Sequence, residues 1–277
     1  MKAPDFAYRR PTSIREAIAL IGEGEDPMLL AGGQSLMPMM NLRMARPDIL
    51  VDLNRIPELR GIRDDGHIVI GAMTRYSELL ASPLVREHLP LFMAALPHVA
   101  HPAIRNRGTI GGSVALADPA AEIPALLLAL GATVVLQGPS GERRVPADDF
   151  FLGIYETARE ADEIVVAIHV PKGGGPFGFY ELARRHGDYA MAGVAVALSE
   201  PRIAFFGVAD RAVRAPAAEA VLRGRNHADP RVLDGAIAAL DLPFGGDLHT
   251  SAETKRHYAG VVLRRALAEP WSELVAA

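Results

Sequence analysis

Two pairs of adjacent glycines, far apart in the sequence, have the residue types and spacing best suited to binding a ligand. The first pair stands in the segment Ala31-Gly32-Gly33-Gln34-Ser35-Leu36, directly after an apolar run. Glycine permits positive φ and leaves no Cβ in the way, so successive N–H groups can converge on an anion. The start of a helix after the pair adds partial positive charge and further N–H donors. This segment therefore predicts a phosphate site.

The second pair stands in the segment Thr109-Ile110-Gly111-Gly112-Ser113, which the acidic residue Asp118 follows. Two such segments suit one ligand with two adjacent phosphates, as in a dinucleotide, and the alternative is that both are only tight turns. Neither segment matches the G-x-G-x-x-G or the G-x-x-x-x-G-K-[ST] pattern, which argues against Rossmann and P-loop folds. Arg105 and Arg107 flank the second segment. We interpret them as solvated loop arginines, and the alternative is electrostatic assistance to a diphosphate.

The composition excludes several classes of protein. A formal net charge of -4 over 277 residues, without a long basic block, disfavours nucleic-acid binding. The chain has no cysteine, so it holds neither a disulfide nor a cysteine-ligated iron–sulfur or zinc site. Any metal redox centre must then lie on a partner. We expect no membrane span, because no apolar run approaches about eighteen residues; without a targeting segment, we expect a cytoplasmic protein.

The first 55 residues predict a small α/β unit. Ser13 and Glu16 form a capping-box pattern at the start of a short amphipathic helix. Strands are expected at 28–31 and 49–53. A second helix is expected from Ser35 until just before Pro47. We place the N-terminal domain at residues 1–55.

The rest of the chain predicts two further α+β units. In residues 56–172 we expect a mixed domain with strands at 67–71 and 132–137, helices at 75–81, 90–100 and 121–130, and a glycine loop at 108–112. The run 171–176, with three glycines and two prolines, predicts a linker or long turn. In residues 177–277 strands precede helices, as in a small α+β domain; the expected strands are 177–183, 191–198 and 203–209, and the expected helices 216–223, 230–240 and 251–268.

At the two glycine segments the sequence resembles the FAD-binding medium subunit of molybdenum hydroxylases, the family of the carbon monoxide dehydrogenase medium subunit and the xanthine dehydrogenase FAD domain. The likeness extends over nearly the whole chain and keeps the same order of segments. The segments that carry it are FAYRRPTSIREAIALI (6–21), AGGQSL (31–36), PDILVDLNRI (47–56), VIGAMTR (69–75), TIGGSVALADPAAEIPA (109–125) and RRHGDYAMAGVAVAL (184–198).

The resemblance implies a PCMH-type FAD-binding fold of class α+β: a small N-terminal α/β unit and a central mixed or antiparallel sheet with helices, followed by a small C-terminal α+β domain. It implies that the two glycine segments hold the FAD diphosphate and that Asp118 and Glu122 bind the ribityl or adenosine part. Gln34 stands where several relatives have His. Tyr189 matches a tyrosine near the flavin ring; its alternative is ordinary core packing. The implied FAD-binding residues are Ala31, Gly32, Gly33, Gln34, Ser35, Leu36, Thr109, Ile110, Gly111, Gly112, Ser113, Asp118, Glu122 and Tyr189.

The resemblance also implies a role in a complex. This chain would be the FAD subunit of a molybdopterin-dependent oxidoreductase and carry no catalytic acid or base. Electrons would reach FAD from [2Fe-2S] clusters on a small partner subunit, after oxidation of the substrate at a molybdenum-pterin on a large partner subunit, and would leave to an external acceptor. The expected assembly is a dimer of heterotrimers.

Two other functions remain open at this point, a self-contained FAD-dependent oxidoreductase of the same fold and a cofactor-free scaffold subunit. The intact glycine segments argue against the scaffold. His98 and His101 have a spacing that could bind a metal, but no convincing third ligand is near, so we interpret them as a solvated or hydrogen-bonded pair and expect no metal site.

Overall fold

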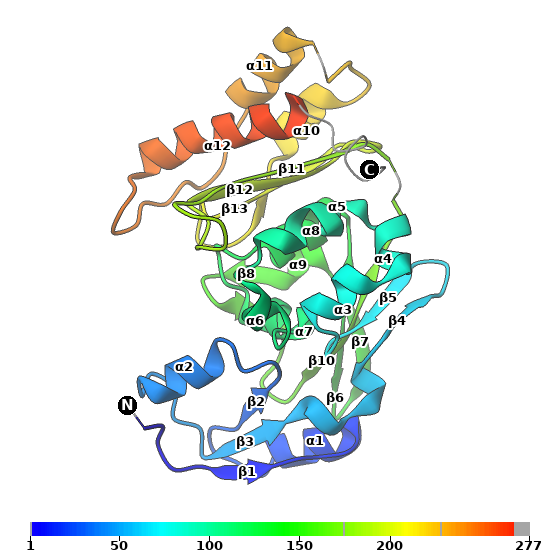
Figure 1. The fold of residues 1–277 in the computed structure, drawn as a ribbon, viewed down its shortest axis with the longest axis vertical. Coiled ribbons are helices and arrows are strands. Elements are labelled where there is room, and N and C mark those ends of the chain that lie inside the picture. Colours follow the sequence, from blue (N-terminus) through cyan, green and yellow to red (C-terminus); the bar gives the residue numbers. More distant parts are fainter. Residues whose placement is uncertain (1, 174, 228, 269–277) are drawn as a thin grey trace.

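A computed structural model describes residues 2–173, 175–227 and 229–268 (Figure 1). Within these ranges the strands form sheets of three, five and four strands and one two-stranded ribbon. Helices cover the sheets, which gives the α+β class that the sequence predicts. The predicted linker at 171–176 lies partly outside the described residues, because Gly174 is not among them.

The N-terminal sheet is parallel, with strand order β1-β3-β2. Its strands are β1 (Ala7–Arg9), β2 (Met28–Leu30) and β3 (Ile49–Asp52), and all four residues of β3 are buried. Helix α1 (Ile14–Ile21) connects β1 to β2, and the Ser13 side chain caps it by accepting from Glu16 N. Parallel strands need such a crossover, and the buried residues of β3 match a strand covered on both faces.

Helix α2 (Leu36–Asn41) is shorter than the sequence predicts. It ends well before Pro47, and Arg43, just beyond its C-terminus, has a φ of +59°. A left-handed residue cannot continue an α-helix, so the chain turns here toward β3.

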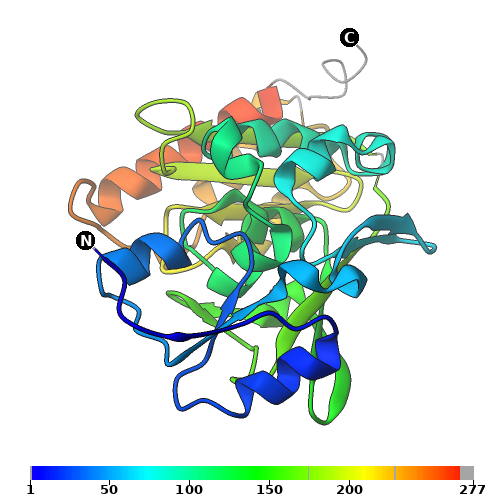
Figure 2. The ribbon, with the colours of Figure 1, turned by 60° about the horizontal axis from the view of Figure 1, so that its bottom comes forward.

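A five-stranded antiparallel sheet forms the middle of the molecule, with strand order β4-β5-β10-β6-β7. The apolar strand β10 lies at its centre, which suits burial on both faces. Side chains of the N-terminal unit pack against one face of this sheet, and Figure 2 shows that unit brought forward. The strands are β4 (Ile62–Asp64), β5 (Ile68–Gly71), β6 (Thr133–Gly138), β7 (Gly141–Pro146) and β10 (Ile164–Val170).

Helices and a small ribbon surround this sheet. The short 3-10 turns Leu53–Arg55 and Pro57–Leu59 lead into it from β3. The helices are α3 (Tyr76–Ala81), α4 (Pro83–His88), α5 (Pro90–Ala95), α6 (Pro102–Arg105), α7 (Ile110–Leu116), α8 (Glu122–Ala129) and α9 (Ala147–Phe150). The ribbon pairs β8 (Phe151–Gly153) with β9 (Glu156–Thr157).

Two predictions for this region are wrong. The helix expected at 90–100 ends at Ala95 and continues only as a 3-10 turn, Leu96–His98. Pro97 has no N–H to donate within a helix, and Ala100 has a φ of +45°. The glycine loop expected at 108–112 is also wrong in part, because Gly111 and Gly112 belong to the first turn of α7.

The C-terminal sheet has strand order β11-β12-β13-β14 and is antiparallel. Its strands are β11 (Phe177–Leu182), β12 (Ala192–Ala197), β13 (Arg202–Phe206) and β14 (Val213–Arg214). One face packs on α10 (Pro216–Leu222), α11 (Pro230–Ala238) and α12 (Ala252–Ala268). The other face packs on α5 and α8, so this sheet lies between two helical layers (Figure 1). None of the described helices is long and apolar enough to cross a membrane.

Candidate functional site

The structure brings the two glycine segments into direct contact. A Cβ at Gly32 would overlap the carbonyl oxygen of Arg107 and lie 2.8 Å from the Cα of Gly108. A Cβ at Gly112 would lie 3.4 Å from the Cβ of Ala31. The segments therefore approach each other as closely as backbone allows, and only glycine fits at position 32 without displacement of the neighbouring chain.

The first segment presents a run of N–H groups with no intramolecular acceptor. The backbone N–H groups from Gly32 to Leu36 make no hydrogen bond to another described residue. Gly33 has a φ of +70°, and Ser35 adopts the right-handed helical region without a side-chain capping bond. Gln34 Nε2 donates to the Gly32 carbonyl at 2.8 Å, which holds the turn. Consecutive N–H groups in such a turn form a concave site for an anion.

The second segment uses most of its N–H groups within the protein, unlike the open phosphate loop that the sequence suggests. Ile110 N donates to the Thr74 carbonyl at 3.0 Å, and Gly111 N donates to the Ala72 carbonyl at 2.8 Å. A Cβ at Gly111 would lie 2.5 Å from the Ala72 Cβ, so this glycine is required by packing. The Thr109 hydroxyl accepts from Gly112 N at 3.2 Å and caps α7.

A polar network around the buried Asp52, which the sequence analysis missed, supports the first segment. Asn54 Nδ2 donates to the Ala31 carbonyl at 2.9 Å and to Asp52 Oδ1 at 2.7 Å. Asp52 is buried, accepts from the Tyr8 hydroxyl and lies 3.5 Å from the Arg10 guanidinium. The signal in the sequence is the polar pair Asp52 and Asn54, the last residue of the buried strand β3 and a residue just beyond it, because polar residues at the end of a parallel strand often serve a site.

The two predicted acidic residues both lie in a dehydrated environment. Asp118 follows Ala117, whose φ is +52°, and its carboxylate accepts from Ala120 N at 2.9 Å. Burial raises the pKa of Asp118. Glu122, the first residue of α8, is 9% exposed, and burial together with the nearby charge of Asp118 raises its pKa to about 7. Carboxyl groups of this kind suit hydrogen bonding with ligand hydroxyls.

Tyr189 is 77% exposed, so the alternative of ordinary core packing is wrong. Desolvation at the protein surface and the charges of Asp118 and Glu122 raise the pKa of its phenol. A second exposed aromatic ring, Tyr155, stands in the turn between β8 and β9, and its pKa is raised by desolvation, by Asp118 and by Tyr189. Both tyrosines thus lie on the side of the acidic pair, and the sequence analysis did not identify Tyr155.

Arg105 also differs from the sequence interpretation, because it is not a solvated loop arginine. Its Nη1 donates to the carbonyl oxygens of Val99 and Ala100, each at 2.9 Å, and of Pro97 at 3.2 Å. Arg105 therefore fixes the turn after α5 against α6, immediately before the second glycine segment.

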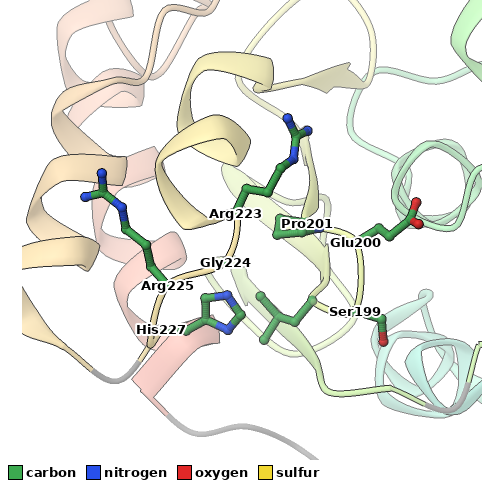
Figure 3. Close-up of a pocket in the computed structure, with 8 residues that line it drawn as sticks. Ser199, Glu200, Pro201, Arg223, Gly224, Arg225 and His227 are labelled. Atoms are coloured by element: carbon green, nitrogen blue, oxygen red, sulfur yellow. The ribbon is translucent and has the colours of Figure 1, made fainter.

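A separate surface hollow of about 520 Å³ lies in the C-terminal part of the described chain (Figure 3). It is lined by Leu198, Ser199, Glu200, Pro201, Arg223, Gly224, Arg225 and His227. None of the predicted FAD-binding residues lines it. Within the described ranges, no group of three or more His, Cys, Asp or Glu side chains could hold a metal ion.

Comparison with known proteins gives this arrangement its context. Residues 4–173 match the family model of the FAD binding domain in molybdopterin dehydrogenase, and residues 178–270 match that of the CO dehydrogenase flavoprotein C-terminal domain. The carbon monoxide dehydrogenase medium chain of Hydrogenophaga pseudoflava is 45% identical, with 98% of this chain and 99% of that protein covered. The nicotine 6-hydroxylase medium subunit of Paenarthrobacter nicotinovorans is 41% identical over 97% of this chain and 98% of its own length.

A solved structure shows the same fold. The carbon monoxide dehydrogenase of Hydrogenophaga pseudoflava, in a form lacking the Mo-pyranopterin moiety of the molybdenum cofactor, contains a chain that superposes with a TM-score of 0.93 at 46% identity. The match covers 98% of this chain and 99% of that one. The fold and paired glycine segments thus define a FAD-binding oxidoreductase subunit. The chain belongs to the family of FAD-binding medium subunits of molybdopterin-dependent dehydrogenases, as the sequence resemblance predicts.

Proposed function

We propose that the FAD diphosphate binds at the junction of the two glycine segments, Ala31 to Leu36 and Thr109 to Ser113. The observation that carries this proposal is the run of five N–H groups from Gly32 to Leu36 that have no acceptor among the residues the structure describes. Their concave arrangement suits a phosphate, and the contact with Arg107 and Gly108 brings the second segment alongside. The contribution of the second segment is its close packing against the first, because most of its own N–H groups are used within the protein.

The acidic pair and the tyrosine complete the proposed site. Asp118 and Glu122 are assigned to hydroxyl groups of the ribityl chain or the adenosine ribose, which can donate to carboxylates. Tyr189 is assigned to the isoalloxazine, where an exposed aromatic ring can limit access to the flavin and tune its electronics. The proposed domains are the N-terminal FAD-binding unit, residues 1–55, the central FAD-binding unit, residues 56–172, and the C-terminal α+β domain, residues 177–277.

In the complex, the chain would transfer electrons. FAD accepts electrons singly or in pairs, which suits a converter between one-electron iron–sulfur clusters and a two-electron acceptor. The chain holds and orients the cofactor, while [2Fe-2S] clusters and a molybdenum-pterin belong to a small and a large partner subunit. The near full-length identity to medium subunits of such enzymes supports this arrangement. We propose a dimer of heterotrimers in the cytoplasm.

The visible spectrum of the purified chain, with identification of the released flavin and of co-purifying subunits, tests this function. FAD together with molybdenum-containing and iron–sulfur partners would support it. FAD on a chain that binds no partner would instead favour a self-contained flavoenzyme. A colourless chain that does not take up added FAD would favour a scaffold.

A further inference from the structure

The carboxyl group of Glu181 is buried without a hydrogen bond. Glu181 is near the end of β11, its side chain is 1% exposed, and neither oxygen has a hydrogen-bond partner among the described residues. Burying a carboxyl group in this way is costly, and an ionised one costs far more than a protonated one. A buried polar group without a hydrogen-bond partner is rare in native proteins and needs a physical explanation.

The histidine next to Glu181 connects it to the loop that carries Tyr189. His98 Nδ1 lies 3.8 Å from Glu181 Oε2. The His98 ring also packs edge-on against the ring of His186, with centroids 5.2 Å apart, and lies 5.1 Å from the ring of Phe179. His186 belongs to residues 183–190, which make up most of the connection between β11 and β12 and which we call the Tyr189 loop.

A backbone contact fixes the same loop at a second point. Gly187 has a φ of +84°, and a Cβ there would lie 2.6 Å from the carbonyl oxygen of Ala100. Arg105 holds that carbonyl through its Nη1. The Tyr189 loop therefore rests on the turn 97–100, and Arg105 connects this turn to the second glycine segment.

A protonated Glu181 beside a neutral His98 suits this packing best. A proton on the Glu181 carboxyl leaves no buried charge, and a neutral His98 can lie beside His186 without repulsion. Burial and the nearby Glu122 raise the pKa of Glu181 to about 8, while burial and His186 lower the pKa of His98. Loss of the Glu181 proton leaves a buried carboxylate. Protonation of His98 as well places a cation beside His186.

We propose that Glu181 and His98 hold one proton between them and act as positioning residues for the Tyr189 loop, so that the placement of Tyr189 depends on that proton. The positioning role is independent of FAD. Its consequence for the flavin rests on the proposed function, which places Tyr189 at the isoalloxazine.

Hydrogen–deuterium exchange of the full-length chain tests this role. Protection of residues 183–190, corrected for intrinsic exchange, should fall by about tenfold between pH 6 and pH 9 as Glu181 ionises. The variant Glu181→Gln should show constant protection over the same range, while the exposed control Glu200→Gln should behave as wild type. Constant wild-type protection, or the same pH dependence in Glu181→Gln, would overturn the proposal.

A second variant keeps the test independent of the folding of Glu181→Gln. His186→Gln removes the ring that contacts His98 and should increase exchange of residues 183–190 at every pH. The control His249→Gln replaces a histidine outside the loop and should leave that exchange unchanged. Unchanged exchange in His186→Gln would also overturn the proposal. Exchange measured on the FAD-free chain tests the positioning role alone, and the flavin spectrum of FAD-loaded samples reports separately on the placement of Tyr189.

Discussion

Gly32, just beyond β2, is in contact with Arg107, in the turn between α6 and α7, and a Cβ at position 32 would overlap the Arg107 carbonyl oxygen. This contact places the free N–H groups of the first glycine segment beside the start of α7. The site therefore depends on a backbone approach between two segments. Neither segment alone forms it.

Substitution of Gly32 tests this approach. Gly32→Ala should lower the free energy of unfolding by about 1–3 kcal/mol, the usual cost of overpacking, and should reduce FAD content. Urea unfolding and the ratio of flavin to protein absorbance measure the two effects. Gly245→Ala is the control, because no heavy atom lies within 4 Å of a Cβ there. Equal stability and flavin content in both variants would contradict the close contact.

Ser35→Asp should separate cofactor binding from stability. Ser35 is exposed at the N-terminus of α2 and makes no capping bond, and an acidic side chain there interacts favourably with the helix dipole, so Asp should maintain stability. The same charge would repel a diphosphate and should weaken FAD binding at least about tenfold, roughly 1.4 kcal/mol. Fluorescence titration of the apoprotein with FAD measures the affinity. Ser13→Asp, at the cap of α1, should leave affinity unchanged; normal affinity in Ser35→Asp would refute the phosphate assignment.

Asn54→Ala should weaken FAD binding by loosening the first glycine segment. The variant removes the hydrogen bonds from Asn54 Nδ2 to Ala31 and Asp52, each worth about 0.5–1.5 kcal/mol, or more when the acceptor is charged. FAD titration and thermal unfolding of the apoprotein should show a loss of affinity beyond that in Asn41→Ala, an exposed position on α2. A loss of stability with unchanged affinity would make Asn54 a purely structural residue.

Glu122→Gln should change how stability depends on pH. The folded-state pKa of Glu122 is about 7, above its ordinary value of 4.5, so the folded protein binds an extra proton between these values. Its contribution is present below about pH 4.5 and is lost as pH rises through 7. Relative to wild type, Glu122→Gln should therefore gain on the order of 1–3 kcal/mol between pH 5 and pH 8. Urea unfolding at both values measures this, with Glu253→Gln as an exposed control; a gain toward low pH would contradict the sign.

Tyr189→Ala should affect the flavin more than the fold. Because Tyr189 is 77% exposed, its removal should change the free energy of unfolding by no more than about 0.5 kcal/mol. The flavin midpoint potential, or the rate of reoxidation by an artificial acceptor, should shift. Leu248→Ala, at a position that is 99% exposed and outside the proposed site, is the control for removal of an exposed side chain. A large loss of stability with unchanged redox behaviour would make Tyr189 a packing residue.

Much of the architecture follows from local sequence. Ser13 and Glu16 predict α1 correctly, and the apolar runs near Met28 and Ile49 predict two strands of the first sheet, because hydrophobic periodicity and capping act over a few residues. Helix ends were predicted less well. The C-terminal ends of α2 and α5 depend on single residues, the left-handed Arg43 and the proline Pro97. Hydrophobic periodicity does not show where such single residues end a helix.

The glycine motifs and the family resemblance identified the class of cofactor, since the residue types that leave backbone N–H groups accessible can be read directly from the sequence. Only the tertiary structure decided which N–H groups remain free. The Gly111 N–H donates to the Ala72 carbonyl and the residue packs against Ala72, so a Gly111 variant would test packing. The N–H groups from Gly32 to Leu36 have no acceptor among the described residues and remain available to a ligand. The roles of Asn54, Arg105 and Glu181 depend on partners distant in sequence, and hydrogen bonding and burial between such partners exist only once the chain has folded.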